Sequence, residues 1–162
     1  MSTGERSYAS DLVGRVSGAG RRFAVVASRF NAHVTGRLLE RATATLLEHE
    51  TAPGDVDVLR VPGAWELPQA ALKAAASGRY HAVVALGCVI RGETPHFDFI
   101  ARETARGLAY AARRSGIPVI FGVLTTDTEE QAVERADPAR GDKGREAALA
   151  ALEMADLFQR MR

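Results

Sequence analysis

The chain has 162 residues, a length typical of one domain that buries its core without disulfides or metal ions. Lys and Arg together number 21 against 20 Asp and Glu, so the near-neutral charge excludes a broad electrostatic surface for nucleic acid or a membrane. The single cysteine, Cys88, excludes an internal disulfide, and a lone strand cysteine is most often a small buried apolar residue.

The first twenty residues are rich in Ser, Gly, Ala and Arg and contain no apolar run long enough for a signal peptide or a membrane span. We therefore expect residues 1–20 to form a flexible tail and residues 21–162 to form a single domain. We also expect a cytoplasmic location. Leu12 and Val13 are apolar enough to lie along a neighbouring surface.

The first half of the domain shows two strand and helix pairs. Residues 22–28 form a short apolar run that predicts a strand, and apolar residues then recur at helical spacing over 34–46. Residues 56–61 predict a second strand. After the turn at Pro62 and Gly63, residues 66–76 predict an alanine-rich helix whose first turn tolerates Pro68.

The second half repeats this order. Residues 82–90 are nearly continuously apolar, as expected of a parallel strand covered on both faces, and a helix follows that stops at Gly116. Residues 117–124 predict the fourth strand. A capping box beginning at Thr126 predicts a short helix to about Ala136, and a closing helix runs to Phe158 with Asp142 as its cap.

Four strands alternating with helices predict an α/β three-layer sandwich with a four-stranded parallel sheet and right-handed crossovers. Ligands bind such folds at the carboxyl ends of the strands. We therefore expect the site near residues 28–31, 61–66, 88–96 and 124–127.

The loop after the third strand is the strongest functional signal. Thr94 followed by Pro95 predicts a helix cap with proline at the first helical position, so backbone N–H groups should be free to bind phosphate. His96 follows in the first turn, where the helix dipole favours a neutral imidazole that can act as a base. On position alone, His96 is more typical of a surface or capping residue.

Other candidates have both a structural and a functional reading. Phe30 and Trp65 lie just past their strands, where each ring either stacks on a ligand or packs under a loop or a second subunit. Glu66 stabilises a helix start or holds ligand N–H and hydroxyl groups. Arg135 complements a helix end or binds phosphate with two hydrogen bonds.

Several site classes are absent from the sequence. His33, His49 and His81 are scattered, and no spacing of His, Cys, Asp or Glu resembles a zinc site, so we expect no metal. No Gly-x-Gly-x-x-Gly follows the first strand, and there is no Walker loop. The first strand also lacks the acidic cluster of a phosphoacceptor domain.

The ordered motifs of residues 22–158 resemble the 6,7-dimethyl-8-ribityllumazine synthase family. The segments that carry the resemblance are Ser28-Arg29-Phe30-Asn31, Val61 to Pro68, Gly87 to Phe97, Phe121 to Thr126, Glu134-Arg135-Ala136 and Asp142-Lys143-Gly144. Several spaced motifs in one order are far more specific than any one of them alone.

The resemblance implies a flavodoxin-like fold and a condensation that makes the immediate precursor of riboflavin. The substrates would be 5-amino-6-(D-ribitylamino)uracil and 3,4-dihydroxy-2-butanone 4-phosphate, and phosphate and water would be released. No cofactor or metal is implied. Riboflavin synthase is a further partner that the resemblance suggests.

The resemblance also assigns roles to individual residues. Phe30 would stack on the pyrimidine, and Phe121 would close the site from an adjacent subunit. Two segments would line the pyrimidine and ribityl site, namely Ala64, Trp65 and Glu66 together with Cys88, Val89 and Ile90. Glu93, Thr94 and Arg135 would hold the phosphate. His96 would move protons, and Lys143 is a further candidate.

Three positions depart from the family pattern. Trp65 stands where the family more often has Phe, and a wider ring alters the pocket. Glu93 puts a carboxylate where many members have a small residue, so its contact with phosphate is expected through backbone N–H groups. Asp142 replaces the more usual Asn before Lys143.

The resemblance implies a homopentamer at least, with sites between subunits. Some members assemble twelve pentamers into hollow capsids. The turn over residues 137–141 lacks the first glycine common in those members, which favours isolated pentamers. Two other functions stay open at this point: a protein that holds flavin or lumazine without synthesis, and a flavodoxin-like electron carrier.

Overall fold

The computed structural model describes residues 8–161 and contains one sheet of four parallel strands in the order β2-β1-β3-β4. The strands are β1 (Phe23–Ser28), β2 (Val56–Val61), β3 (Ala82–Ile90) and β4 (Val119–Thr126). This is the flavodoxin-like order without its fifth strand, so the prediction of a four-stranded parallel sheet is confirmed.

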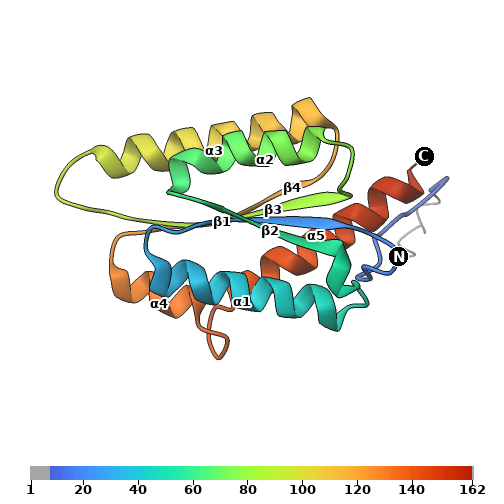
Figure 1. Ribbon diagram of the computed structural model, residues 1–162, viewed down its shortest axis with the longest axis horizontal. Coiled ribbons are helices and arrows are strands. Elements are labelled where there is room, and N and C mark those ends of the chain that lie inside the picture. The colour runs from blue at the N-terminus through green and yellow to red at the C-terminus, as the bar shows by residue number, and fades with distance from the viewer. Residues whose placement is uncertain (1–7, 162) are drawn as a thin grey trace, which may run out of the picture.

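Helices cover both faces of the sheet, which confirms the three-layer sandwich. Figure 1 shows two helices on one face, α2 (Leu67–Ala76) and α3 (His96–Ser115). Three lie on the other, α1 (Ala32–Glu48), α4 (Glu129–Ala136) and α5 (Lys143–Arg160). Short 3-10 helices at Pro53–Asp55 and Ala64–Glu66 lead into β2 and α2. The carboxyl ends of the strands meet at one edge, where the long loop between β3 and α3 also lies (Figure 1).

Every residue of β1 is buried, because helices cover this central strand on both sides. Side chains alternate between the two faces of a strand, so β1 contributes to two separate apolar clusters. Val25 packs with Leu38 in the cluster under α1 and α5. Val26 packs with Leu67 in the cluster under α2 and α3. The apolar run that predicted this strand is therefore explained by burial on both faces.

The end of β4 and the start of α4 differ from the sequence expectation. β4 begins and ends two residues later than predicted, because Thr126 is still paired with Ile90 of β3. The predicted capping box at Thr126 is wrong. Thr128 caps α4 instead, and its Oγ1 accepts a hydrogen bond from the backbone N of Gln131 at 3.1 Å. Sheet pairing takes precedence over the local capping signal.

The start of α3 also differs from the sequence prediction by one residue, whereas its end agrees with that prediction. The first helical acceptor is the carbonyl of Pro95, which binds the backbone N of Asp98 at 3.0 Å. Pro95 is therefore the cap residue and His96 begins the helix, so the predicted Thr94 cap is wrong. The predicted stop at Gly116 is confirmed, since this glycine takes a left-handed φ of 76°.

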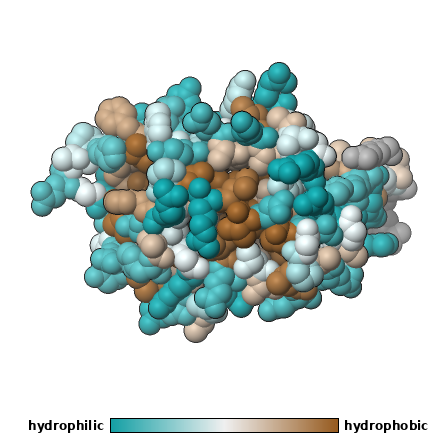
Figure 2. Space-filling model, in the orientation of Figure 1, coloured by the Kyte–Doolittle hydropathy of each residue, from teal (hydrophilic) through white to brown (hydrophobic). Residues whose placement is uncertain are grey.

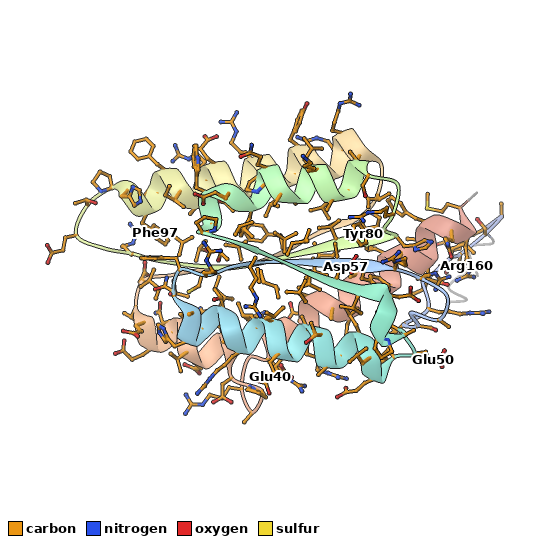
Figure 3. All side chains as sticks on the ribbon, viewed as in Figure 1. Glu40, Glu50, Asp57, Tyr80, Phe97 and Arg160 are labelled. Carbon is orange, nitrogen blue, oxygen red and sulfur yellow. The ribbon has the colours of Figure 1, made fainter. Side chains whose placement is uncertain are left out.

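Residues 1–7 of the expected tail lie outside the described residues. Residues 8–22 contain no helix or strand, and part of this segment lies against α5 and the end of α1. Arg160 donates a hydrogen bond to the carbonyl of Val13 at 2.6 Å, and the backbone N of Gly18 donates to His49 at 2.7 Å. Figure 3 places Arg160 at the end of the molecule opposite Phe97. A separate flexible tail over residues 1–20 stays a prediction.

A buried carboxylate on α5 holds the same segment. Asp156 is 4% exposed, and its two oxygens accept hydrogen bonds from the backbone N of Arg15 at 2.7 Å and the guanidinium of Arg21 at 2.8 Å. The Arg15 N–H, and then Arg21, hold the pKa of Asp156 below its ordinary value despite burial. The ionised carboxylate therefore stabilises the folded state.

We expect Asp156→Asn to lower the free energy of unfolding at pH 7 by about 2 kcal/mol, because Arg21 loses its charged partner. A lowered folded-state pKa means that this contribution is present above the ordinary pKa of 3.8 and is lost as the pH falls through the folded value. Urea unfolding from pH 7 to pH 3 should show the difference from wild type narrowing below about pH 4. The control is Asp55→Asn at a more exposed ion pair. A difference that does not change with pH would contradict the prediction.

Candidate active site

Three strand ends and the start of α3 enclose a cavity of about 350 Å³ at the carboxyl edge of the sheet. We call it the first cavity. Its walls come from the turn after β1, the loop after β2, the end of β3 and the loop that follows β3. Eight of the residues predicted for the site line it: Phe30, Ala64, Trp65, Cys88, Val89, Ile90, Thr94 and His96. The structure thus brings together residues from segments up to 66 positions apart in the chain.

Asn31 fixes the turn that carries Phe30. Its backbone is left-handed, with φ 61°, a conformation that Asn tolerates better than most residues. Its side-chain amide donates a hydrogen bond to the carbonyl of Cys88 at 3.0 Å and so joins the ends of β1 and β3. Asn31 also lines the first cavity. The sequence analysis included Asn31 in a motif but did not select it as a site residue.

The two aromatic candidates are both exposed at this edge. Phe30 is 72% exposed and Trp65 is 59% exposed, and both line the first cavity. The backbone N of Phe30 donates to the carbonyl of Pro62 at 3.0 Å, so the ring stands on a fixed part of the main chain. Exposed rings on a rigid support are typical of surfaces that stack on a ligand or meet another subunit.

Cys88 contributes a small apolar wall to the cavity. Its side chain is buried, and burial raises the pKa of its thiol to about 11, with a smaller effect from the charge of Glu129. The thiol is therefore protonated at neutral pH and is not a nucleophile. This agrees with the structural reading of a lone strand cysteine.

His96 is exposed and lines the first cavity as the first residue of α3. Within residues 8–161, no hydrogen bond or ion pair engages its ring. The loop before it is tied down by Arg91, whose guanidinium lies 4.5 Å from the centre of the Phe97 ring and donates to Asp127 at 2.9 Å. His96 is therefore held on an ordered helix start with its ring free to meet a ligand.

Two predicted carboxylates lie beside the cavity and are not part of its lining. Glu66 accepts a hydrogen bond from the backbone N of Gly63 at 3.1 Å, which closes its own short helix. This geometry supports the structural reading of Glu66. Glu93 is exposed on the loop, between Gly92 and Thr94, which do line the cavity. Contacts of either carboxylate with a ligand stay a prediction.

Residues that the sequence analysis did not select also line the first cavity, namely Gly63, Gly92, Phe97 and Ile100. Three of them, Gly63, Gly92 and Phe97, lie within the motifs that carry the family resemblance. Ile100 lies four residues after His96, so the two share one face of α3. The two glycines lie in loops whose path was not predictable from the local sequence.

The remaining predicted residues lie elsewhere, in a second cavity of about 330 Å³ between β4 and the α4 and α5 helices. Phe121, Arg135 and Lys143 line this second cavity, and no residue lines both cavities. Phe121 is 48% exposed on the edge strand. One chain therefore carries the predicted site residues in two separate groups.

The second cavity has an excess of positive charge. Arg135 and Lys143 line it together with one carboxylate, Glu146, which accepts a hydrogen bond from Lys143 at 2.9 Å. Among residues 8–161, Arg135 donates only to a carbonyl of its own helix, that of Gln131 at 3.3 Å. Its guanidinium keeps donors for an anion such as a phosphate group.

Residues 8–161 contain no group of three or more His, Cys, Asp or Glu side chains arranged to bind a metal ion. Within that same range, no helix combines the length and the apolar character needed to cross a membrane.

Comparison with known proteins identifies the family. The sequence model of 6,7-dimethyl-8-ribityllumazine synthase matches residues 20–159. The chain belongs to the 6,7-dimethyl-8-ribityllumazine synthase family. A curated relative from Gemmatimonas aurantiaca, named 6,7-dimethyl-8-ribityllumazine synthase, is 56% identical over 151 residues, which cover 93% of this chain and 92% of the relative.

The residues that match the lumazine synthase family include those of both cavities. The matched span of residues 20–159 includes every residue predicted for the site, from Phe30 to Lys143. It also includes the turn over residues 137–142, which connects the two helices that carry Arg135 and Lys143. The resemblance found from the sequence motifs is therefore confirmed for the whole domain.

Proposed function

We propose that this chain carries out the reaction of the lumazine synthase family at sites that two copies of the chain complete together. The reaction condenses 5-amino-6-(D-ribitylamino)uracil with 3,4-dihydroxy-2-butanone 4-phosphate and releases 6,7-dimethyl-8-ribityllumazine, phosphate and water. One observation carries the proposal of a shared site: the predicted residues divide between two cavities with no common lining residue. The first cavity of one copy would face the second cavity of its neighbour.

The first cavity suits the ribitylaminouracil. Phe30 and Trp65 provide aromatic faces for stacking a flat pyrimidine ring. Val89 and Ile90, at the end of β3, are half-buried and form an apolar part of the cavity lining beside main-chain polar groups. Phe121 of the neighbouring copy would cover the ring from the other side.

The butanone phosphate would bind between the start of α3 and the second cavity of the neighbour. Backbone N–H groups around Thr94 and Glu93 lie at a helix start, where the dipole favours an anion. Arg135, with Lys143, would supply the cationic side. In this arrangement Glu93 contributes through its backbone while its exposed carboxylate faces solvent.

His96 would act as the acid and base. The reaction needs proton transfer when the imine forms, when phosphate leaves and when the second ring closes, and a free imidazole beside the phosphate suits each step. Holding two reactive substrates together also contributes several kcal/mol to the rate. His96 is therefore expected to accelerate a reaction that positioning alone already favours.

The proposal includes a homopentamer. Besides Phe121, the chain has a groove along the edge strand β2 whose solvent-accessible apolar lining includes Leu59, Ala70 and Ala76. Figure 2 shows apolar surface in the middle of this face, between the two helical layers. Contact with other copies would remove such surface from water. A cytoplasmic location and a contact with riboflavin synthase complete the proposal by family resemblance.

We expect isolated pentamers of about 90 kDa, because the turn over residues 137–141 lacks the first glycine of capsid-forming members. Sedimentation velocity of the purified protein measures the particle mass. A particle near one megadalton, as sixty chains of 17.4 kDa would give, would overturn this expectation.

We expect His96→Ala to lower kcat by about 10²-fold without abolishing turnover, because proximity remains when the acid and base is lost. The assay mixes the protein with both substrates and follows lumazine fluorescence and phosphate release together, against a protein-free control. His33→Ala, at an exposed histidine outside both cavities, is the matched control. An unchanged kcat for His96→Ala would refute the role of this residue. No acceleration by the wild-type protein would refute the proposed function.

The shared site predicts complementation between two impaired variants. His96→Ala damages only the first cavity and Arg135→Ala only the second, so a mixed oligomer contains sites with both cavities intact. Random mixing of equal amounts should restore about a quarter of the wild-type activity per site. Co-expression with two affinity tags isolates the mixed oligomers. Activity no higher than the mean of the two single variants would show that each site lies within one chain.

A further inference from the structure

The two cations of the second cavity come from opposite ends of one turn. Arg135 is the last residue but one of α4, and Lys143 is the first residue of α5. Residues 137–142 connect them. The spacing and direction of the two cations therefore depend on the conformation of these six residues.

The turn packs directly on the backbone of α4. The backbone N of Gly141 donates to the carbonyl of Glu134 at 3.2 Å. A Cβ atom at Gly141 would lie 2.6 Å from the Cα of Arg135, so only glycine permits this approach. The end of the turn is thus fixed against the residue that carries the first cation.

The last residue of the turn, Asp142, is held by α1. The guanidinium of Arg41 donates two hydrogen bonds to the carboxylate of Asp142, from Nε to Oδ1 and from Nη2 to Oδ2, each 2.9 Å long. Two residues further on, a Cβ atom at Gly144 would lie 2.4 Å from the carbonyl oxygen of Leu38. Lys143 therefore lies between two residues that are both fixed to α1.

Asp142 occupies the cap position of α5, as the sequence predicts, but its side chain makes no cap hydrogen bond. The carboxylate binds Arg41 instead. Its backbone is left-handed, with φ 45° and ψ 46°, which costs free energy in any residue other than glycine. The paired hydrogen bonds from Arg41 offset that cost and select this conformation of the turn.

A purely structural role is the alternative, in which the pair only ties α1 to α5. A second ion pair already joins these helices, Arg145 with Glu48 at 3.6 Å, and it is more exposed than the Arg41 pair. The Arg41 pair differs from it in geometry, because Arg41 makes two hydrogen bonds to one carboxylate. It also differs in place, because Asp142 comes directly before Lys143. Arg145→Ala is therefore a matched control, because it removes an ion pair between the same two helices without changing a contact of the turn.

We propose that Arg41 is a positioning residue for the butanone phosphate: by holding Asp142, it sets the turn so that Arg135 and Lys143 both face the second cavity. This inference rests on the proposed phosphate role of those two cations. Arg41 itself lines neither cavity and acts only through Asp142.

The test compares Arg41→Ala, Arg41→Lys and Arg145→Ala by steady-state kinetics with each substrate varied, and by thermal unfolding. We expect Arg41→Ala to raise KM for the butanone phosphate about tenfold, with KM for the ribitylaminouracil unchanged. Arg41→Lys keeps the charge but cannot make the paired hydrogen bonds, so it should show most of the same increase. Arg145→Ala should leave both KM values unchanged.

A double variant supplies a rescue. In Arg41→Ala/Asp142→Asn, the amide needs no guanidinium partner and still tolerates the left-handed backbone, so KM for the butanone phosphate should return toward wild type. An Arg41→Ala variant that shifts only the unfolding midpoint, or both KM values equally, would overturn the inference. So would a double variant that shows no rescue.

Arg135→Ala, measured in parallel, separates this inference from the proposed function. If Arg135→Ala raises KM for the butanone phosphate and Arg41→Ala does not, the phosphate role stands and the positioning role of Arg41 is refuted. If Arg135→Ala leaves that KM unchanged, the phosphate role fails, and the inference about Arg41 fails with it.

Discussion

Burial of the sheet on both faces is the constraint on which the rest of this molecule depends. Helices cover β1 so well that all six of its residues are buried, and most of β3 is buried in the same way. A polar or charged group in the middle of such a strand would lose its water without gaining a partner. On the inner strands β1 and β3, ligand-binding residues are therefore confined to the strand ends, and in a parallel sheet the carboxyl ends lie at one edge.

The strand order places the two cavities at different parts of the sheet. β1, β2 and β3 are neighbours, and together with the start of α3 they build the first cavity. β4 is the edge strand beside β3, and its exposed Phe121 lies in a cavity formed with the last two helices, α4 and α5. If the first cavity of one copy met the second cavity of another, the contact would cover Phe121 and other surface that a single chain leaves exposed.

The loops and turns at both cavities are held in place by side-chain hydrogen bonds. Asn31 ties the turn after β1 to the carbonyl of Cys88, and Arg91 ties the loop before His96 to Asp127. Arg41 holds the turn before Lys143 in the same manner. Each contact fixes a loop at the edge of a rigid sheet, which suits a reaction that gains much of its rate from the placement of two substrates.

The sequence by itself determined the strands, the helices and the family. Apolar runs and helical periodicity are local signals, so all four strands and five helices were predictable within about two residues at most ends. The tertiary structure decided what depends on distant partners. Thr126 fails as a cap because it pairs with Ile90, and Asp142 turns from its own helix toward Arg41, 101 residues earlier. The division of the site residues between two cavities follows from strand order, which local sequence does not encode, because order in a sheet is fixed by packing between distant segments.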